Sequence, residues 1–438
     1  MITTIEITEQ RRGRAFRGAI TGHLIEWYDY GVYGFLAVYI GKLFFPDNGD
    51  GTQLLSSFAV FALSFFIRPL GGLFFGPMAD RIGRKRTLVL VMIVMFGATF
   101  MIGVLPTYAS VGFLAPVLLI VARCAQGFSA GGEIGTTTSF IAEYAGPGRR
   151  GYSTSWLMVT AVLGLLLGGL VANGLIAGLG DDAMLSWGWR IPFLIAGPLG
   201  VIALYIRLKI EDSPEFEALA TSGNESKAPL REVWQWRRAI ALIFCIITLH
   251  ASLFYLVLTY SSTYMSENLG FDKMSRLLLV FLACLVMAVV MPFGGRFTDR
   301  HGRRGLLLVS GVLATFATIW FFQAAHDATP WSFLAPLLAV SALVGLYASS
   351  TYATMSDLLP TRVRSTGIAV AYNLPVALFG GSAPLISAWL VDKTGDIASP
   401  WYFYVATCLL SIGGLIALRD SDFERATVES PALAETAA

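Results

Sequence analysis

The chain has 438 residues, of which 55% are hydrophobic and only 14% charged, and its mean hydropathy is +0.66. An average soluble domain carries about 25% charged residues. The composition therefore excludes an ordinary soluble protein and indicates an integral membrane protein. The formal net charge of +2 is too small to point to nucleic acid, so we expect no nucleic-acid partner.

Twelve apolar stretches are long enough to cross a bilayer as helices, since a span needs about 20 mostly apolar residues. Glycine, proline and clusters of charge mark their boundaries. The predicted spans are residues 17–41, 54–78, 87–106, 112–142, 152–178, 189–208, 238–263, 276–298, 305–325, 331–356, 365–391 and 400–419. The predicted fold class is an all-α integral membrane protein with twelve transmembrane helices.

Four arginines precede the first span: Arg11, Arg12, Arg14 and Arg17. A cleaved signal peptide or a twin-arginine leader is the alternative interpretation of this pattern. The apolar segment that follows is too long for a leader, carries two acidic residues and lacks a cleavage site of small residues. We therefore expect a retained first span with a basic cytoplasmic flank.

Charged residues inside the predicted spans are concentrated in the first half of the chain: Glu26, Asp29, Arg68, Arg123 and Glu133. Each costs about 2.5–3.5 kcal/mol at the bilayer centre on insertion scales. Arg68 comes 12 residues before Asp80, which at the rise of an α-helix places it about 18 Å from the charged end of its span. Such deep charges need a structural or a functional reason.

Two interpretations of these charges remain open. In the first, they form structural ion pairs, such as Asp29 with Arg123, that fix helix register. In the second, they line a polar cavity in which a carboxylate changes its protonation during transport. Arginine keeps its proton, so the proton carriers would be Asp29, Glu26 or Glu133, with Arg123 as the partner; His23 lies too near the cytoplasmic end.

Candidate substrate-binding residues surround the same depth: Arg68, Arg123, Trp27, Tyr30, Tyr33, Tyr255 and Asn373. The arginines suit a carboxylate, and the aromatic rings suit an apolar or quaternary-ammonium part. The alternative is that the aromatic residues only pack or lie at the membrane interface. Asn373 is favoured because Pro375 should bend its helix and expose backbone groups.

Two charged turns recur at nearly the same offset. GGLFFGPMADRIGRKR at 71–86 returns as GGRFTDRHGRR at 294–304, which places Asp80 on Asp299 at an offset of 219 residues. Glu143, before Gly148-Arg149-Arg150, matches Asp357, before Arg362 and Arg364, at an offset of 214. This repetition predicts two related halves.

The repeat divides the chain into predicted domains. Residues 1–208 and 238–420 form six-helix bundles, residues 209–237 form a polar cytoplasmic linker, and residues 421–438 form a disordered tail. With both termini in the cytoplasm, 23 of the 31 Lys and Arg residues lie inside and five lie outside, namely Lys42, Arg190, Lys273, Arg276 and Lys393. This bias predicts a multi-pass protein of the plasma (inner) membrane with cytoplasmic termini.

Two pairs of glycines have the GxxxG spacing that permits close helix approach. They are Gly127 with Gly131 in the fourth span and Gly164 with Gly168 in the fifth. The chain has 45 glycines, so chance matches are expected and the signal is weak.

Several motifs together resemble a known family. GGLFFGPMADRIGRKR resembles the signature between the second and third helices of the major facilitator superfamily, and the copy at 294–304 lies where its second copy is expected. EWYDYGVYGF, FFIRPLGGLFFG, ARCAQGFSAGGE and WGWRIPF resemble the metabolite:proton symporters within it, across about residues 16–420. That family contains carriers of proline/betaine, α-ketoglutarate, citrate, dicarboxylates and shikimate.

The resemblance implies two six-helix bundles that rock about a central site. It also implies that a charged network closes the cytoplasmic gate in the outward-open state, with candidate residues Gly72, Asp80, Arg81, Gly83, Arg84, Glu143, Asp299, Arg300 and Asp357. Asp29 falls where related sugar/proton symporters carry a protonatable aspartate, and Arg123 falls where they carry its partner. The proline-containing motif of drug/proton antiporters is missing from the fifth span, which disfavours an exporter. The C-terminal coiled coil of some osmosensing proline/betaine carriers is missing as well.

The expected function is proton-coupled uptake, by alternating access, of a small carboxylate-bearing metabolite, either an organic acid or a zwitterion of the proline/betaine type. A proton-coupled efflux antiporter is the alternative. An enzyme is not expected, because no nucleophile–base set, nucleotide loop or metal-ligand spacing is present. We expect no cofactor and no metal, a proton gradient as the energy source, and a monomer embedded in the lipid bilayer.

Overall fold

The computed structural model describes residues 9–46, 52–145, 148–326 and 328–428, and these residues contain helices and no strand. The first half contains α1 (Glu9–Phe44), α2 (Thr52–Ile82), α3 (Arg84–Val104), α4 (Tyr108–Val111), α5 (Leu114–Ala145), α6 (Arg150–Ala183), the π-helix η1 (Met184–Gly188) and α7 (Arg190–Leu208). The link between the halves contains α8 (Pro214–Ser222), α9 (Pro229–Glu232) and the 3₁₀ turn η2 (Val233–Trp236).

The second half begins with a span of three pieces: α10 (Arg237–Tyr255), the π-helix η3 (Leu256–Tyr260) and α11 (Ser261–Glu267). The helices that follow are α12 (Lys273–His301), α13 (Arg303–Gln323), α14 (Pro330–Asp357), the 3₁₀ turn η4 (Thr361–Val363), α15 (Arg364–Pro375), the π-helix η5 (Val376–Gly381), α16 (Ala383–Thr394), α17 (Trp401–Ala417) and α18 (Asp420–Val428).

Each of the twelve predicted spans coincides with one helix or one continuous group of helices. Within the described residues, ten of these are long and apolar enough to cross a membrane, and α17 joined to α18 across a 65° bend makes an eleventh. The first span, α1, is 36 residues long but carries the N-terminal arginines and two acidic residues. The predicted twelve-helix fold is therefore consistent with the structure, and its first span stands out by its charge.

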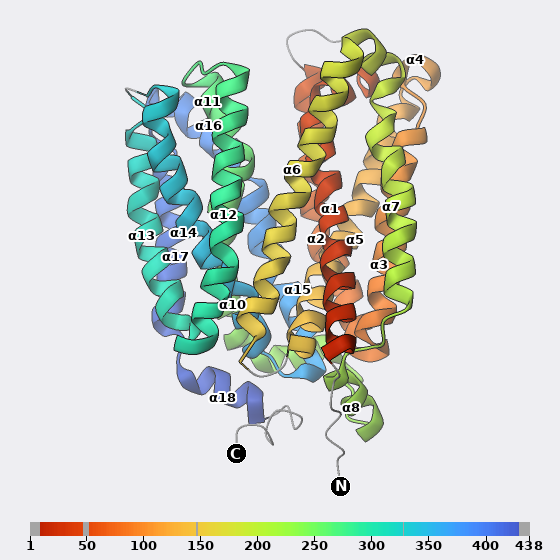
Figure 1. The fold of residues 1–438 in the computed structure, drawn as a ribbon, viewed down its shortest axis with the longest axis vertical. Helices are drawn as coiled ribbons and strands as arrows, with labels where there is room; N and C mark the ends of the chain where they lie inside the picture. Colours follow the sequence, from red (N-terminus) through yellow and green to blue (C-terminus); the bar gives the residue numbers. More distant parts are fainter. Residues whose placement is uncertain (1–8, 47–51, 146–147, 327, 429–438) are drawn as a thin grey trace.

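The two halves of the chain stand side by side as bundles (Figure 1). In the first half α1 packs on α6, α2 on α5 and α3 on α7; in the second α12 packs on α14, α10 on α17 and α13 on α14. Between the halves, α6 packs on α12, and α15 packs on α2 and α5. We call the end where α1 begins and α18 lies the terminal end, and the other end the opposite end.

Glycines permit the closest helix contacts within the first half. A Cβ atom on Gly127 would lie 2.1 Å from the carbonyl oxygen of Ser64, and one on Gly131 would lie 1.9 Å from that of Arg68. Gly164 and Gly168 meet the backbone of α1 in the same way. Both GxxxG pairs, a weak signal in the sequence, are therefore true contact surfaces, α5 on α2 and α6 on α1.

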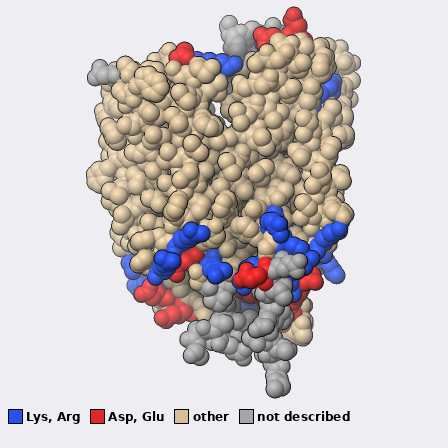
Figure 2. Space-filling view, viewed as in Figure 1, with Lys and Arg blue, Asp and Glu red and all other residues tan. Residues whose placement is uncertain are grey.

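The outer surface is apolar over most of its height. Figure 2 shows Lys, Arg, Asp and Glu gathered at the two ends, with a broad band between them that carries none on this face. Large apolar side chains such as Phe66, Leu70 and Phe74 of α2 are about half exposed. In water this exposure would be costly, so the band is the lipid-facing surface.

The predicted disordered tail, residues 421–438, differs from the structure over residues 421–428. There α18 forms, with Asp420 and Asp422 in its first turn, where acidic side chains favour a helix. The Asp422 carboxylate also accepts a hydrogen bond of 2.7 Å from Nε of Arg238, at the start of α10, and this bond lowers the pKa of Asp422. Residues 429–438 lie outside the described residues.

Candidate functional site

The predicted pair of Asp29 and Arg123 is present at the centre of the first half. The Arg123 guanidinium lies 3.4 Å from Oδ2 of Asp29, and both side chains are buried. Gln126, one turn along α5, links them because its amide donates to Asp29 at 2.7 Å and its oxygen accepts from Arg123 at 2.8 Å. The same amide donates to Thr99 of α3 at 2.7 Å. Sequence reasoning missed Gln126 and Thr99.

This network leaves part of its hydrogen-bonding capacity unused. Oδ1 of Asp29 and Nε and Nη2 of Arg123 are buried without a hydrogen-bond partner among the described residues. The guanidinium instead lies 3.7 Å from the centre of the Tyr33 ring. Buried polar groups normally have partners, so these atoms are available to a proton, to water or to a polar solute.

Arg68 of α2 lies in a separate, aromatic environment. Its guanidinium carbon is 4.4 Å from the centre of the Phe65 ring and 4.8 Å from that of Tyr30. Tyr255, at the end of α10, packs edge-on against Phe65 with ring centres 5.4 Å apart. Nε and Nη2 of Arg68 are buried and find no hydrogen-bond partner among the described residues; the Tyr30 hydroxyl lies beside Arg68 without completing a well-aligned hydrogen bond.

Glu26 and Glu133 form a buried pair of carboxyl groups between α1 and α5. They are 5% and 6% exposed, and each lies within electrostatic reach of the other and of Arg68. An ionised carboxylate only accepts hydrogen bonds, so the two groups can bond to each other only when one of them carries a proton.

The structure places the remaining predicted substrate residues in different surroundings. Trp27 packs on Tyr30 with ring centres 5.6 Å apart, and its Nε1 donates to His23 at 3.2 Å. The hydroxyl of Tyr33 donates to the carbonyl of Ser57, so Tyr33 belongs to the Arg123 side of the site and not to the Arg68 side.

Asn373 connects the two halves. Its amide donates to the carbonyl of Gly131 in α5 at 2.8 Å and to that of Ala369 in its own helix at 2.7 Å. A Cβ atom on Gly72 would lie 2.7 Å from the same amide nitrogen. The irregular turn that follows Pro375 is the π-helix η5, and Asn373 itself lies in the contact between the halves.

The candidate gate at the terminal end contains two equivalent sets of hydrogen bonds, one for each half of the chain. Asp80 accepts hydrogen bonds from the backbone N–H groups of Ser365 (3.2 Å) and Thr366 (2.8 Å), in the first turn of α15. Asp299 accepts from those of Gly151 (2.7 Å) and Tyr152 (2.8 Å), in the first turn of α6. The partners are 214 residues apart, as in the sequence repeat. Each aspartate caps a helix of the other half, where the helix dipole favours a negative charge.

The second repeated pair is equally symmetric. Glu143 accepts hydrogen bonds from Arg84 at 3.2 Å and from Arg364 at 2.9 Å. Asp357 forms ion pairs with Arg150 at 2.9 Å and with Arg303. Arg84 corresponds to Arg303 by the first offset, and Arg150 corresponds to Arg364 by the second. Arg150, Arg303 and Arg364 were absent from the predicted gate, although the repeated arginine motifs contained all three of them.

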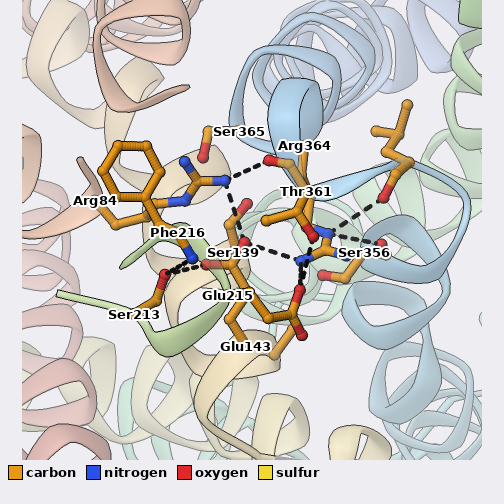
Figure 3. Close-up of polar contacts among 12 residues, drawn as sticks. Arg84, Ser139, Glu143, Ser213, Glu215, Phe216, Ser356, Thr361, Arg364 and Ser365 are labelled. Atoms are coloured by element: carbon orange, nitrogen blue, oxygen red, sulfur yellow. Dashed lines mark hydrogen bonds and ion pairs between the residues drawn. The ribbon is translucent and has the colours of Figure 1, made fainter. Parts of the chain in front are cut away.

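A carboxylate from the linker closes the network. Glu215, in the first turn of α8, forms ion pairs with Arg150 at 2.5 Å and with Arg364 at 2.7 Å, and accepts from the Thr361 hydroxyl at 2.7 Å. It thus joins two corresponding arginines from opposite halves. Figure 3 shows Glu215 beside Thr361 and Arg364. Burial alone would raise the pKa of Glu215, but Arg364 and Arg150 outweigh that effect and lower the pKa to about 2.

A glycine with a positive φ angle occupies the same place in each of the two repeated turns. Gly83, between α2 and α3, has φ 104°, and Gly302, between α12 and α13, has φ 80°. Residues with a Cβ atom rarely adopt this conformation. Arg81 and Arg300, which were predicted in the gate, are exposed, and Arg81 donates to the carbonyl of Lys227 in the linker.

A helical membrane protein with two related bundles, buried charges at its centre and a doubled charged network at one end has the architecture of a membrane transporter, and the chain's family and relatives are transporters, not enzymes. The family model "Major Facilitator Superfamily" matches residues 21–374. The chain belongs to this superfamily and, within it, to the metabolite:proton symporters. It is a multi-pass inner-membrane protein.

Three curated relatives are 33% identical to the chain. They are a proline/betaine transporter of Salmonella typhimurium (95% of this chain, 85% of the relative), a citrate-proton symporter of Klebsiella pneumoniae (93% and 94%) and an α-ketoglutarate permease of Escherichia coli (93% and 94%). The fold matches the proton:xylose symporter XylE with a TM-score of 0.81 at 16% identity, over 94% of this chain and 96% of that one.

Proposed function

We propose that this chain takes up a small carboxylate-bearing metabolite together with protons, and that its terminal end faces the cytoplasm. The observation that carries the proposal is the environment of Arg68: a buried guanidinium with unused donors, enclosed by aromatic rings. A carboxylate is the natural partner for such donors. The solutes in the names of the three relatives differ in size and charge, but each of them bears a carboxylate.

Two buried acidic centres support proton coupling. Asp29 shares its network with Arg123 and Gln126, and Glu26 lies within electrostatic reach of Glu133. Both centres lie on α1, as does Tyr30, which borders Arg68. A carboxylate solute that arrives at Arg68 changes the charge beside both centres, so that proton binding and solute binding become linked.

The contacts at the two ends support alternating access. At the terminal end, Asp80, Asp299 and Glu215 tie the halves together. At the opposite end, a cavity of about 480 Å³ opens between α1, α6, η1, α11 and α12. This arrangement fits an outward-facing state of an uptake carrier. The charge bias of the sequence supports a cytoplasmic terminal end; the efflux alternative has no feature of the site in its favour.

A binding experiment tests the substrate class. We expect proline, glycine betaine, α-ketoglutarate or citrate to raise the melting temperature of the purified protein, because a ligand that binds only the folded state stabilises it. Arg68→Gln should lose this shift, since removing one partner of a buried charged contact costs about 2–5 kcal/mol. Arg68→Lys keeps the charge without the planar fork and should retain weakened binding.

The matched control is Arg14→Gln, which removes a positive charge near the start of α1, far from the site. It should bind as the wild type does. If Arg68→Gln folds and keeps full affinity for the stabilising carboxylate, then Arg68 is structural and the proposed substrate contact is wrong.

A further inference from the structure

The cavity at the opposite end is lined by more positively than negatively charged side chains. Three basic side chains line it: Lys42 of α1 and Lys273 and Arg276 of α12. They are three of the five Lys and Arg residues that the sequence places at that end. The acidic side chain in the lining, Asp181, accepts a hydrogen bond of 2.5 Å from Tyr39. Figure 2 shows the surface hollowed near this end, with basic side chains close by.

The usual distribution of basic residues in membrane proteins does not explain why these three cations lie at the opposite end. Basic residues are normally depleted at the outer end of an inner-membrane protein. Lys273 and Arg276 also lie in the first turn of α12, where the helix dipole disfavours positive charge. The carboxylate of Asp272 is engaged with the backbone N–H of Ser275, and Nε of Arg276 is buried without a hydrogen-bond partner among the described residues.

The lining of the cavity reaches to about one helical turn from the buried site. Gly34 of α1 forms part of its lining and lies four residues beyond Tyr30, which borders Arg68. At the rise of an α-helix this separation is about 6 Å along the axis. A Cβ atom on Gly34 would meet no atom within 4 Å, so the lining is open at this point. A solute in the cavity is therefore about one helical turn from the residues around Arg68.

We propose that this cavity is an anion-collecting vestibule, and that the transported solute is an organic acid with net negative charge and not a zwitterion. The proposal rests on the proposed function and narrows its substrate class. Lys42, Lys273 and Arg276 raise the local concentration of anions at the mouth before Arg68 receives the carboxylate. Clefts lined by one sign of charge speed the arrival of oppositely charged ligands, and salt weakens the effect.

Charged thiol reagents measure the potential in the cavity without knowledge of the substrate. The test protein carries Gly34→Cys, with the partly exposed Cys124 and Cys245 replaced by serine. We measure its rates of reaction with an anionic methanethiosulfonate (sulfonatoethyl) and a cationic one (trimethylammonioethyl). Each rate is divided by the rate at which the same reagent reacts with 2-mercaptoethanol in solution, which corrects for the reactivity of the reagent itself. Zwitterionic phosphatidylcholine vesicles exclude anionic lipid headgroups as competing ligands.

We expect the anionic reagent to be favoured roughly three- to thirtyfold at low ionic strength, as Coulomb interaction with a net excess of two cations implies. The preference should fall toward the solution value in Lys42→Gln/Lys273→Gln/Arg276→Gln and at high salt. Lys393→Gln, an exposed lysine at the same end that does not line the cavity, should leave it unchanged. An absent preference, or one that the triple substitution leaves intact, overturns the proposal.

A transport measurement connects the potential to the solute. At low salt and subsaturating concentration, the triple variant should take up an anionic substrate several times more slowly than the Lys393→Gln control, with kcat unchanged. Equal uptake by both overturns the vestibule, as does a substrate found to be zwitterionic. If the Gly34→Cys protein with all three cations in place shows no anion preference but gradient-driven uptake is intact, this inference alone is refuted. An intact preference without gradient-driven uptake refutes the proposed function instead.

Discussion

Asp29 carries the proton-coupling hypothesis at the level of single residues. It is 2% exposed, yet one of its oxygens is held by Arg123 and Gln126 and the other has no partner among the described residues. A group that served only to fix the register of α1 against α5 would be expected to use both oxygens. The half-used carboxylate is suited to gaining and losing a proton while its position stays fixed.

We predict that Asp29→Asn abolishes proton-driven accumulation but retains substrate binding. Asparagine preserves the shape and the acceptor oxygen for Gln126, but it cannot exchange a proton. The measurement is gradient-driven uptake compared with the ligand-induced rise in melting temperature. Asp392→Asn, which alters an exposed carboxylate at the opposite end, is the control. Wild-type accumulation in Asp29→Asn would exclude this residue from coupling.

Glu215 gives the gate a pH dependence that can be stated in advance. The folded pKa of about 2 lies below the value of about 4.3 for an unperturbed glutamate. Its stabilising contribution is therefore complete above the unfolded pKa and is lost as pH falls toward 2.

We predict that Glu215→Gln lowers the melting temperature by a constant amount between pH 8 and about pH 5. Below about pH 4 the difference from wild type should shrink, because the wild-type carboxylate then loses its advantage. Glu424→Gln, an exposed position on α18, serves as the control. A difference that grows as the pH falls from 5 to 3 would contradict the assigned ion pairs with Arg150 and Arg364.

Among the helices, glycines divide into two groups by what they touch. Gly127 of α5 meets the backbone of α2 within its own half, whereas Gly135 of α5 and Gly76 of α2 meet α15 of the other half. A Cβ atom on Gly135 would lie 2.5 Å from the carbonyl oxygen of Ser365. Contacts of the first group hold a bundle together, and those of the second join the two halves at the terminal end, so we expect them to be lost when that end opens.

We predict that Gly135→Ala opens the terminal end while Gly127→Ala destabilises the fold. Overpacking costs about 1–3 kcal/mol, which is enough to shift an equilibrium between two conformations. Spin labels at the exposed positions 86 and 300, one on each half, should move apart in Gly135→Ala. In Gly127→Ala their distance should be unchanged and the melting temperature lower. An unchanged distance in folded Gly135→Ala would refute the assignment.

The π-helices η3 and η5 of the second half each interrupt a span, whereas η1 of the first half follows the end of α6. η3 begins directly after Tyr255, and a Cβ atom on Gly380 of η5 would lie 2.7 Å from the Tyr255 ring. Both irregular segments therefore lie near the aromatic wall of Arg68. Near Arg68 the first half supplies buried charge, and the second half supplies two widened helical turns, which are common at functional sites. Neither π-helix could be predicted, because local sequence does not distinguish such a turn from a regular one.

At the scale of the whole molecule, the repeat explains why so much was predictable. The lengths of the apolar stretches predicted the spans. The sequence repeat is also present in space, since Asp80 and Asp299 each cap a helix of the other half. The pairing of Asp29 with Arg123 followed from their depth. Glu215 was missed because the linker has no counterpart in the repeat, and a carboxylate there normally faces water. Gln126 and Thr99 were missed because neither residue type is unusual in a membrane helix.

The most direct test of the account is transport in proteoliposomes with an imposed proton gradient. With a more acidic exterior, we predict that a radiolabelled carboxylate that binds the protein accumulates inside against its own gradient. A protonophore and Asp29→Asn should each abolish the accumulation. Radiolabelled α-ketoglutarate and citrate test the anionic class, and proline and glycine betaine test the zwitterionic class. Extrusion of the solute under the same gradient, or accumulation that persists with the protonophore, would contradict proton-coupled uptake.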